Sequence, residues 1–321
     1  MGRKAWVRAL SAVLSIAVVA YVGWAMSRNW KAYTSQPLET HLRWGMVLAS
    51  GGVIVTAYAV LVQTWRIMLV EWGGRLSFWR AAHIWSVTNL YRYVPGWVWQ
   101  IGAMGVMAQR EGVSPIAATG SSILSTIVNI TTGFAIALGS GSVALDALHP
   151  GTSRVAFVLT LAAIAGLVAL PVAMPGILAV LRRATGRDIP EATVPPRVIA
   201  YAIVGNLIAW FLYGLALYLL VIGVLGRATG ALSSYIAVYS ASYVLGYIVV
   251  FLPAGAGVRD GSMAAALPAF RLMTGPQALL IAVASRLLTS ILDVVPGFLF
   301  LAVDAWRRRS TSQPRPNASS R

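Results

Sequence analysis

Long uncharged apolar runs recur along the chain and restrict it to one broad class of fold. Ala9–Ser27 and Trp44–Trp65, for example, contain no Asp, Glu, Lys or Arg. About 20 consecutive apolar residues are enough for a helix to cross a bilayer. Of the 321 residues, 58% are hydrophobic and 11% are charged, whereas soluble domains carry about 25% charged residues. With a mean hydropathy of +0.74, the sequence predicts an all-α polytopic membrane protein.

One stretch, Phe251–Met263, lies deep in an apolar region and is unlike a membrane helix. It contains a proline, three glycines and the charged pair Arg259 and Asp260. Proline removes a backbone donor, and glycine permits conformations that other residues avoid. The candidates for unwound backbone are Pro253, Gly255 and Gly257. Non-helical backbone at membrane depth is tolerated only inside protein or beside a wet cavity, so we predict a re-entrant or broken helical hairpin that builds a site. A short loop outside the membrane is the alternative.

A second stretch of this kind occurs earlier, at Asn89–Gly96. Arg92 lies within an otherwise apolar segment and is followed by Pro95 and Gly96, which we predict as a second point of unwound backbone. The chain thus has two predicted broken hairpins, one in each half.

Six full crossings are expected besides these hairpins. They are Ala9–Ser27, Trp44–Trp65, Ile116–Leu138, Arg154–Leu181, Val198–Gly226 and Pro276–Trp306, with a loop at Gly139–Ser153. Basic residues then concentrate on the side that carries both termini, which the positive-inside rule places in the cytoplasm. We therefore expect an integral plasma (inner) membrane protein with a single membrane domain over residues 1–310. Residues 311–321 are Ser-, Pro- and Arg-rich and are predicted to form a disordered cytoplasmic tail.

The order of these segments suggests an inverted repeat, with halves at about 5–140 and 154–306. Each half reads as two spans, a broken hairpin and a further span, and Ser121–Val128 resembles Ser285–Leu292. Three crossings per half invert the second half relative to the first. Inverted repeats with interrupted helices at matching positions are the best sequence pointer to a transporter site.

Three arginines at membrane depth, Arg92, Arg259 and Arg286, are candidate substrate-binding residues. A buried guanidinium is expensive in lipid and is well shaped to bind phosphate or carboxylate. Pairing with a local acid is the alternative: Arg259 adjoins Asp260, and Asp293 follows Arg286 on the same helical face. Arg92 has no acid close to it in sequence. The excess of basic over acidic groups favours recognition of an anion, while Asp260 or Asp293 could still carry protons.

The sequence offers little for catalysis, metal binding or nucleic acid. The chain has no Cys, and His41, His83 and His149 are scattered without metal-ligand spacing. It has no phosphate-binding loop. The formal charge of +16 is spread along an inserted chain and is interpreted as a topology signal. We expect no enzymatic activity, no cofactor, no metal and no nucleic-acid partner.

Two motifs resemble those of a known family. Pro253–Gly261 resembles the P-G-G-x-G-x-R-E-G signature of the lysylphosphatidylglycerol synthase transmembrane (flippase-like) family, with Ala254 and Asp260 in place of the usual Gly and Glu. Asn89-x-x-Arg92-x-x-Pro95-Gly96 resembles its earlier motif, and the resemblance covers roughly residues 5–306. It implies a polytopic lipid translocase, and with its motifs Asn89 and Asp260 join the substrate-binding candidates. The family's aminoacyl-transferase domain is not part of the resemblance.

These observations predict a flippase-like transporter that moves an anionic lipid or lipid-linked precursor between leaflets. The expected partners are membrane lipids with anionic headgroups. The alternative is a non-transporting membrane subunit that scaffolds a lipid or cell-envelope glycan synthase. Association with such a synthase, or with a second copy of the chain, stays open.

Overall fold

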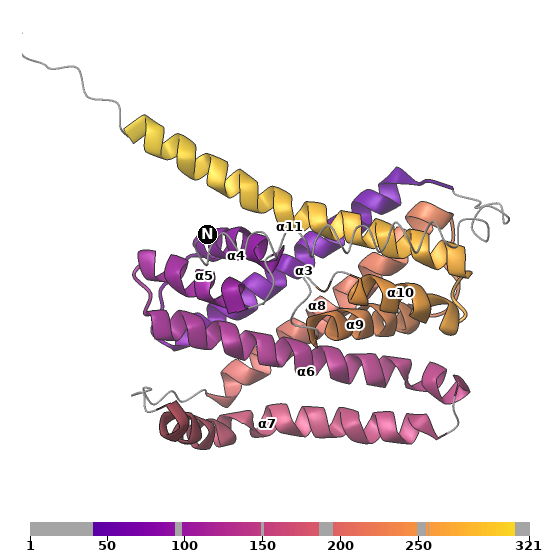
Figure 1. The fold of residues 1–321 in the computed structure, drawn as a ribbon, viewed down its shortest axis with the longest axis horizontal. Helices are drawn as coiled ribbons and strands as arrows, with labels where there is room; N and C mark the ends of the chain where they lie inside the picture. Colours follow the sequence, from indigo (N-terminus) through magenta and orange to yellow (C-terminus); the bar gives the residue numbers. More distant parts are fainter. Residues whose placement is uncertain are drawn as a thin grey trace, which may run out of the picture.

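The computed structural model describes residues 41–93, 98–148, 151–185, 195–248, 255 and 257–311, and these residues form a bundle of helices (Figure 1). In chain order the helices are α3 (Trp44–Glu71), α4 (Phe78–Asn89), the 3-10 helix η1 (Leu90–Tyr93), α5 (Val98–Arg110), α6 (Pro115–Leu148), α7 (Thr152–Thr185), α8 (Pro196–Leu225), α9 (Leu232–Ile248), α10 (Val258–Ala269) and α11 (Gly275–Thr311).

Five of these helices are long and apolar enough to cross a membrane. The qualifying stretches are Trp44–Glu71, Ala117–Ser142, Thr152–Ala173, Pro196–Leu225 and Gly275–Trp306. They match five of the six predicted spans, and the sixth, Ala9–Ser27, lies outside the described residues, as does the predicted tail beyond Thr311. The prediction of an all-helical protein with several membrane-spanning helices is confirmed for the described part of the chain.

The predicted loop at Gly139–Ser153 is wrong over most of its length, because α6 continues as a helix to Leu148. The glycines in this segment allow close packing where a loop was expected. A Cβ on Gly141 would lie 3.4 Å from Ala237 of α9 and 3.5 Å from Phe270. Small residues let membrane helices approach closely, so tertiary packing keeps this weak helix former helical.

Both regions that were predicted to be broken are interrupted helices. The first consists of α4, η1 and α5, and the second of α9 and α10. Gly255 and Gly257 lie between α9 and α10 with φ of 65° and 83°, conformations that glycine adopts without strain. Pro95, Gly96 and Pro253 lie outside the described residues. The re-entrant path and the inverted repeat stay predictions.

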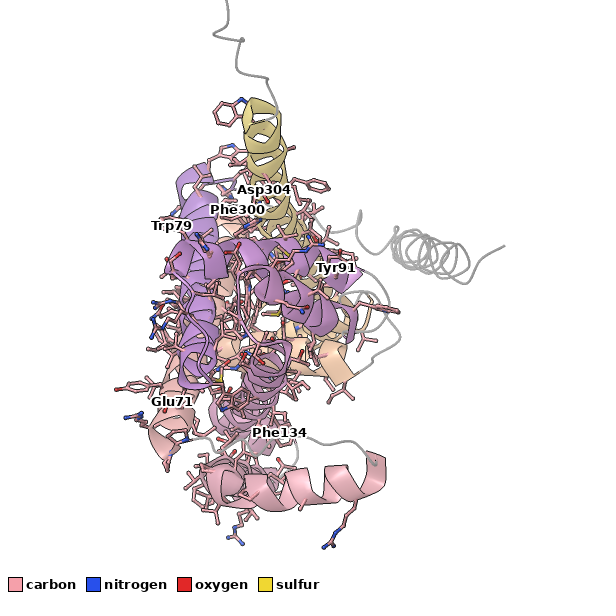
Figure 2. All side chains as sticks on the ribbon, turned by 90° about the vertical axis from the view of Figure 1, so that its left-hand side faces the viewer. Glu71, Trp79, Tyr91, Phe134, Phe300 and Asp304 are labelled. Carbon is pink, nitrogen blue, oxygen red and sulfur yellow. The ribbon has the colours of Figure 1, made fainter. Side chains whose placement is uncertain are left out.

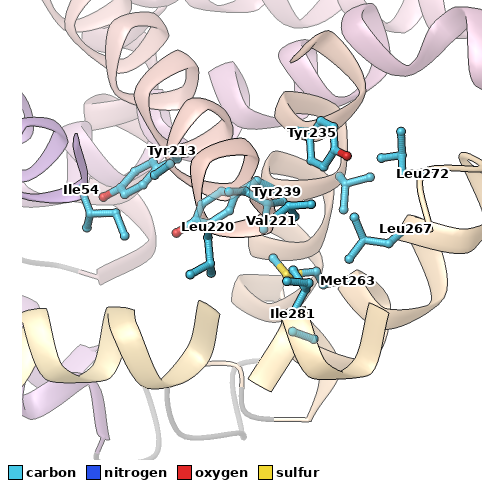
Figure 3. Close-up of a cluster of buried hydrophobic side chains, with 14 of the residues drawn as sticks. Ile54, Tyr213, Leu220, Val221, Tyr235, Tyr239, Met263, Leu267, Leu272 and Ile281 are labelled. Carbon is cyan, nitrogen blue, oxygen red and sulfur yellow. The ribbon is translucent and has the colours of Figure 1, made fainter. Parts of the chain in front are cut away.

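The main core joins α3, α8, α9, α10 and α11. Ile54, Leu220, Tyr239, Met263 and Ile281 are buried there side by side (Figure 3). The α3 and α8 helices pack closely along their length, and the Ser50 hydroxyl donates a hydrogen bond of 2.7 Å to the Ala216 carbonyl. Satisfying a buried hydroxyl across two helices avoids the cost of leaving it unpaired in an apolar interior.

In contrast, α7 lies at one edge of the molecule, where it packs mainly on α6 (Figure 1). Its large apolar side chains point outward: Val172 is 85% exposed, and Phe157 and Val158 are each 62% exposed. In a bilayer such side chains face acyl chains, so their exposure identifies the outer, lipid-facing surface of the bundle.

The last span, α11, crosses the opposite side and packs on both α4 and α10. The His83 ring of α4 stacks on Phe300, with ring centroids 5.0 Å apart, and its Nε2 lies 3.1 Å from an Asp304 carboxylate oxygen. Figure 2 shows Phe300 and Asp304 in the same part of the molecule as Trp79 of α4, away from Glu71. This contact holds the first interrupted region against α11 and so fixes its position in the bundle.

Candidate functional site

A cavity lies between the first interrupted region and the helices α3, α6, α8 and α9. Its volume, counted as room for the centre of a water-sized molecule, is about 60 Å³, and the space between atoms, including open solvent at its mouth, is about 710 Å³. Arg92 is the one charged side chain among the described residues that line it. The aromatic lining residues are Tyr58, Trp65, Trp85, Tyr213, Tyr243 and Tyr247, and the neutral polar ones are Gln100, Ser122, Ser125, Thr126 and Asn129. The cavity is thus aromatic and polar, with a single cation.

Arg92 reaches this cavity from η1 and is paired with an acid on α11. Its Nη1 lies 3.6 Å from an Asp293 carboxylate oxygen. The Asp293 side chain is 6% exposed and that of Arg92 is 23% exposed, so the carboxylate is buried while the guanidinium retains access to the cavity. Arg92 has no acid close to it in sequence, and Asp293 becomes its partner because α11 packs against η1.

Asp293 is held by two further donors. The Tyr58 hydroxyl donates to its Oδ1 at 2.8 Å, and the Asn89 amide approaches the same oxygen at 3.4 Å. Asn89 also accepts a hydrogen bond of 2.8 Å from Gln100. Removing water from a carboxylate is expensive unless hydrogen bonds and a counter-charge replace it, and Tyr58, Asn89 and Arg92 together provide both. The network joins α3, α4, η1, α5 and α11 behind the cavity.

Arg259 has a different environment although it also adjoins an interruption. It is 7% exposed, and its Nη2 donates a hydrogen bond of 3.0 Å to the Tyr239 hydroxyl. Its guanidinium carbon lies 5.2 Å from the Tyr239 ring centroid and 5.4 Å from that of Tyr243, within the range of a cation–π interaction. Tyr243 lines the cavity, so Arg259 lies one ring behind the cavity wall.

The tyrosines around Arg259 form an ordered stack. Tyr213 and Tyr239 are nearly parallel, with ring centroids 5.0 Å apart. Figure 3 shows their hydroxyl groups turned to the same side, away from Leu267 and Leu272. The stack belongs to the main core, while the Tyr239 hydroxyl accepts from Arg259 and Tyr213 lines the cavity.

The other candidates lie at the edge of this arrangement. The Asp260 carboxylate accepts from the Gly257 backbone N–H at 3.3 Å and lies in the first turn of α10, where an acid complements the helix dipole. Arg286 is half-buried on α11. Neither residue lines the cavity. The structure thus brings Asn89 and Arg92 together at the cavity, places Arg259 behind it, and puts Asp260 at a helix start.

The sequence interpretation missed most of the cavity wall. Asp293 was recognised as a membrane-depth acid but was considered as a partner for Arg286. Along α9, Tyr235, Tyr239, Tyr243 and Tyr247 recur every fourth residue, a spacing that puts side chains on one helical face. That tyrosine stripe was the available signal for an aromatic wall.

The described residues contain no group of three or more His, Cys, Asp or Glu that could hold a metal ion. The model of one family, described as the lysylphosphatidylglycerol synthase TM region, matches residues 10–297. A comparison with curated proteins finds no match.

Proposed function

Because the chain belongs to the lysylphosphatidylglycerol synthase transmembrane-region family, we propose that it is a flippase-like transporter. It moves an anionic lipid between leaflets, with the headgroup passing through the cavity and the acyl chains remaining in the bilayer. In this proposal the two interrupted regions move at the breaks between their helices, which in the second region include Gly255 and Gly257 with positive φ.

The observation that carries this proposal is the environment of Arg92. It is the one charged residue among the described cavity-lining side chains, and its acid partner is buried behind it. A guanidinium has five N–H donors, so contact with Asp293 leaves donors that can bind phosphate oxygens in a bidentate manner. The pair holds Arg92 in place before a lipid arrives, and the lipid phosphate does not have to displace Asp293.

Asp293 partly neutralises the charge of Arg92. This suits a transporter, which must release its lipid, better than a site that only holds a lipid. An unpaired arginine would bind phosphate too tightly to release it, and an unpaired buried charge would destabilise the fold. With Asp293 in place, the lipid phosphate forms charge-assisted hydrogen bonds worth about 1.5–3 kcal/mol. Such a contact is strong enough for recognition and weak enough for release into the other leaflet.

A reconstitution experiment tests the proposal. The purified chain is placed in liposomes that contain fluorescent phosphatidylglycerol, and dithionite quenching measures transfer between leaflets. Compared at equal folded yield, because the substitution also removes the counter-charge of Asp293, Arg92→Gln should slow transfer about tenfold or more, as expected for the loss of a contact of that strength. Arg92→Lys should restore part of the rate, because lysine keeps the charge without the planar fork.

The matched control is Arg80→Gln in the same region. Arg80 pairs with Glu111 at 2.5 Å, and its side chain is 64% exposed, so its loss should leave the rate within about twofold. Equal rates in the Arg92→Gln and wild-type proteins would overturn the proposed role of the cavity. Wild-type liposomes that transfer no faster than protein-free ones would instead favour the scaffold alternative.

A further inference from the structure

The cavity wall is richer in aromatic rings and neutral hydrogen-bonding groups than recognition of a phosphate requires. We infer that the transported lipid carries a ring-shaped, hydroxyl-rich headgroup, a hexose or cyclitol, which binds beside its phosphate. This inference rests on the proposed function and names the substrate class of the same cavity.

The aromatic lining residues supply surfaces for the apolar faces of such a ring. Tyr58, Trp85 and Tyr243 are partly exposed and line the cavity. Trp65, whose ring centroid lies 6.3 Å from that of Trp85, and Tyr213 are buried behind them. Sugar and cyclitol rings expose C–H groups on their flat faces and hydroxyls around their edge. A pocket with aromatic walls and a few placed polar groups matches that distribution.

The polar groups complement the hydroxyl edge. The Trp85 Nε1–H is buried and has no hydrogen-bond partner in the described part of the chain, which is expensive unless a ligand accepts from it. Gln100 and Asn129 line the cavity, and their side-chain nitrogens donate to Asn89 and Asn206; their carbonyl oxygens are the acceptors for the headgroup in this inference. Hydroxyl groups both donate and accept and therefore satisfy both kinds of group.

Other headgroups fit the wall less well. A cationic headgroup would meet Arg92 in the lining, and the Tyr243 ring already interacts with the Arg259 guanidinium behind it. A bare phosphate would engage Arg92 and leave the Trp85 donor and the two amide oxygens without partners, which weakens binding. A neutral ring bearing hydroxyls engages all of them.

Lipid binding by the full-length chain, measured by native mass spectrometry, tests the inference. Phosphatidylinositol and phosphatidylglycerol carry the same charge, so the comparison isolates the ring. We expect phosphatidylinositol to bind about tenfold more tightly, as one or two additional hydrogen bonds would provide. Free myo-inositol 1-phosphate, which lacks acyl chains, should bind much more weakly than the lipid.

Two variants connect that preference to the cavity. Trp85→Phe keeps an aromatic ring and removes the unpartnered donor, and Asn129→Leu removes an acceptor that is outside the Arg92–Asp293 network. Each should reduce phosphatidylinositol affinity about three- to tenfold, with phosphatidylglycerol affinity within about twofold. The control is Trp79→Phe on the same helix, because Trp79 is 73% exposed and does not line the cavity. Variants are compared at equal folded yield.

The possible outcomes separate this inference from the proposed function. Equal binding of the two lipids, with both dependent on Arg92, would overturn the ring-shaped headgroup and leave the transporter proposal standing. A ring preference unchanged in both Trp85→Phe and Asn129→Leu would also overturn the inference, since the ring would then bind elsewhere. Loss of any dependence on Arg92 would overturn the proposed function itself. Equal binding of free inositol phosphate and phosphatidylinositol would show that the ligand is a soluble phosphate ester rather than a lipid.

Discussion

The two interrupted regions each place an arginine beside a break in a helix, yet the two arginines have opposite surroundings. Arg92 in the first region faces the cavity and is paired with the buried carboxylate of Asp293. Arg259 in the second is buried against Tyr239 and Tyr243 and donates to a phenol oxygen. The comparison shows that charge at membrane depth can serve two purposes. The Arg92 side chain lines the cavity, whereas the Arg259 side chain packs α10 against α9 through its contacts with Tyr239 and Tyr243.

The largest effect is expected at the ion pair of the first region. Asp293→Leu leaves the Arg92 guanidinium without its counter-charge, and breaking a buried pair costs about 3–5 kcal/mol. The double variant Arg92→Met with Asp293→Leu should recover most of that loss, because no isolated charge remains. Reversible unfolding in mixed detergent micelles measures both. If the double variant were as unstable as Asp293→Leu alone, the two side chains would not be acting as a pair.

A smaller effect is expected where the second region packs on itself. A Cβ on Gly246 of α9 would lie 2.7 Å from the Arg259 Cβ, so Gly246→Ala should destabilise the fold by about 1–3 kcal/mol through overpacking. Gly261 of α10 is the matched control, since nothing lies within 4 Å of its Cβ position. Gly261→Ala should be neutral or stabilising by up to about 1 kcal/mol. Equal stability changes in the two variants would contradict the close approach of α9 and α10.

The smallest effect on stability is expected at Arg259 itself. Arg259→Lys keeps the charge and loses the planar contact with the two tyrosine rings, which is worth about 0.5–2 kcal/mol. Its affinity for anionic lipid should stay within about twofold of wild type, whereas Arg92→Lys should lower that affinity severalfold. Thermal unfolding and lipid titration on the same samples check both values. A loss of lipid affinity in Arg259→Lys equal to that in Arg92→Lys would remove the distinction between the two regions.

Much of the fold was predictable because its determinants are local. Uncharged apolar runs located five of the long helices, and the Pro, Gly and Arg residues near Asn89–Gly96 and Phe251–Met263 located both interruptions. The end of α6 was not predictable from Gly139 and Gly141, whose weak helix propensity is overridden by packing, of Gly139 near Thr160 of α7 and of Gly141 against Ala237 of α9.

The site was less predictable because it depends on contacts between distant segments. Arg92 and Asn89 stood out by type and position. However, the approach of Asn89 to Asp293 joins residues 204 positions apart, and nothing local indicates which acid folds back onto which arginine. The wall of α9 is an exception, since its tyrosine spacing is visible in the sequence. Arg259 could not be distinguished from Arg92 by residue type. An arginine next to a helix break has the same sequence pattern whether its side chain faces a ligand cavity or a tyrosine ring.

The central claim is that an anionic lipid headgroup enters the cavity beside Arg92. A phosphatidylinositol analogue with a photoreactive diazirine on its headgroup tests this directly, with mass spectrometry locating the labelled residues in the reconstituted chain. The account predicts labels on cavity residues such as Gln100, Asn129 and Tyr243, and about a tenfold loss of these labels in Arg92→Gln but not in Arg259→Lys. Labelling confined to outward-facing positions of α7 such as Phe157 and Val172, and unchanged in Arg92→Gln, would contradict it.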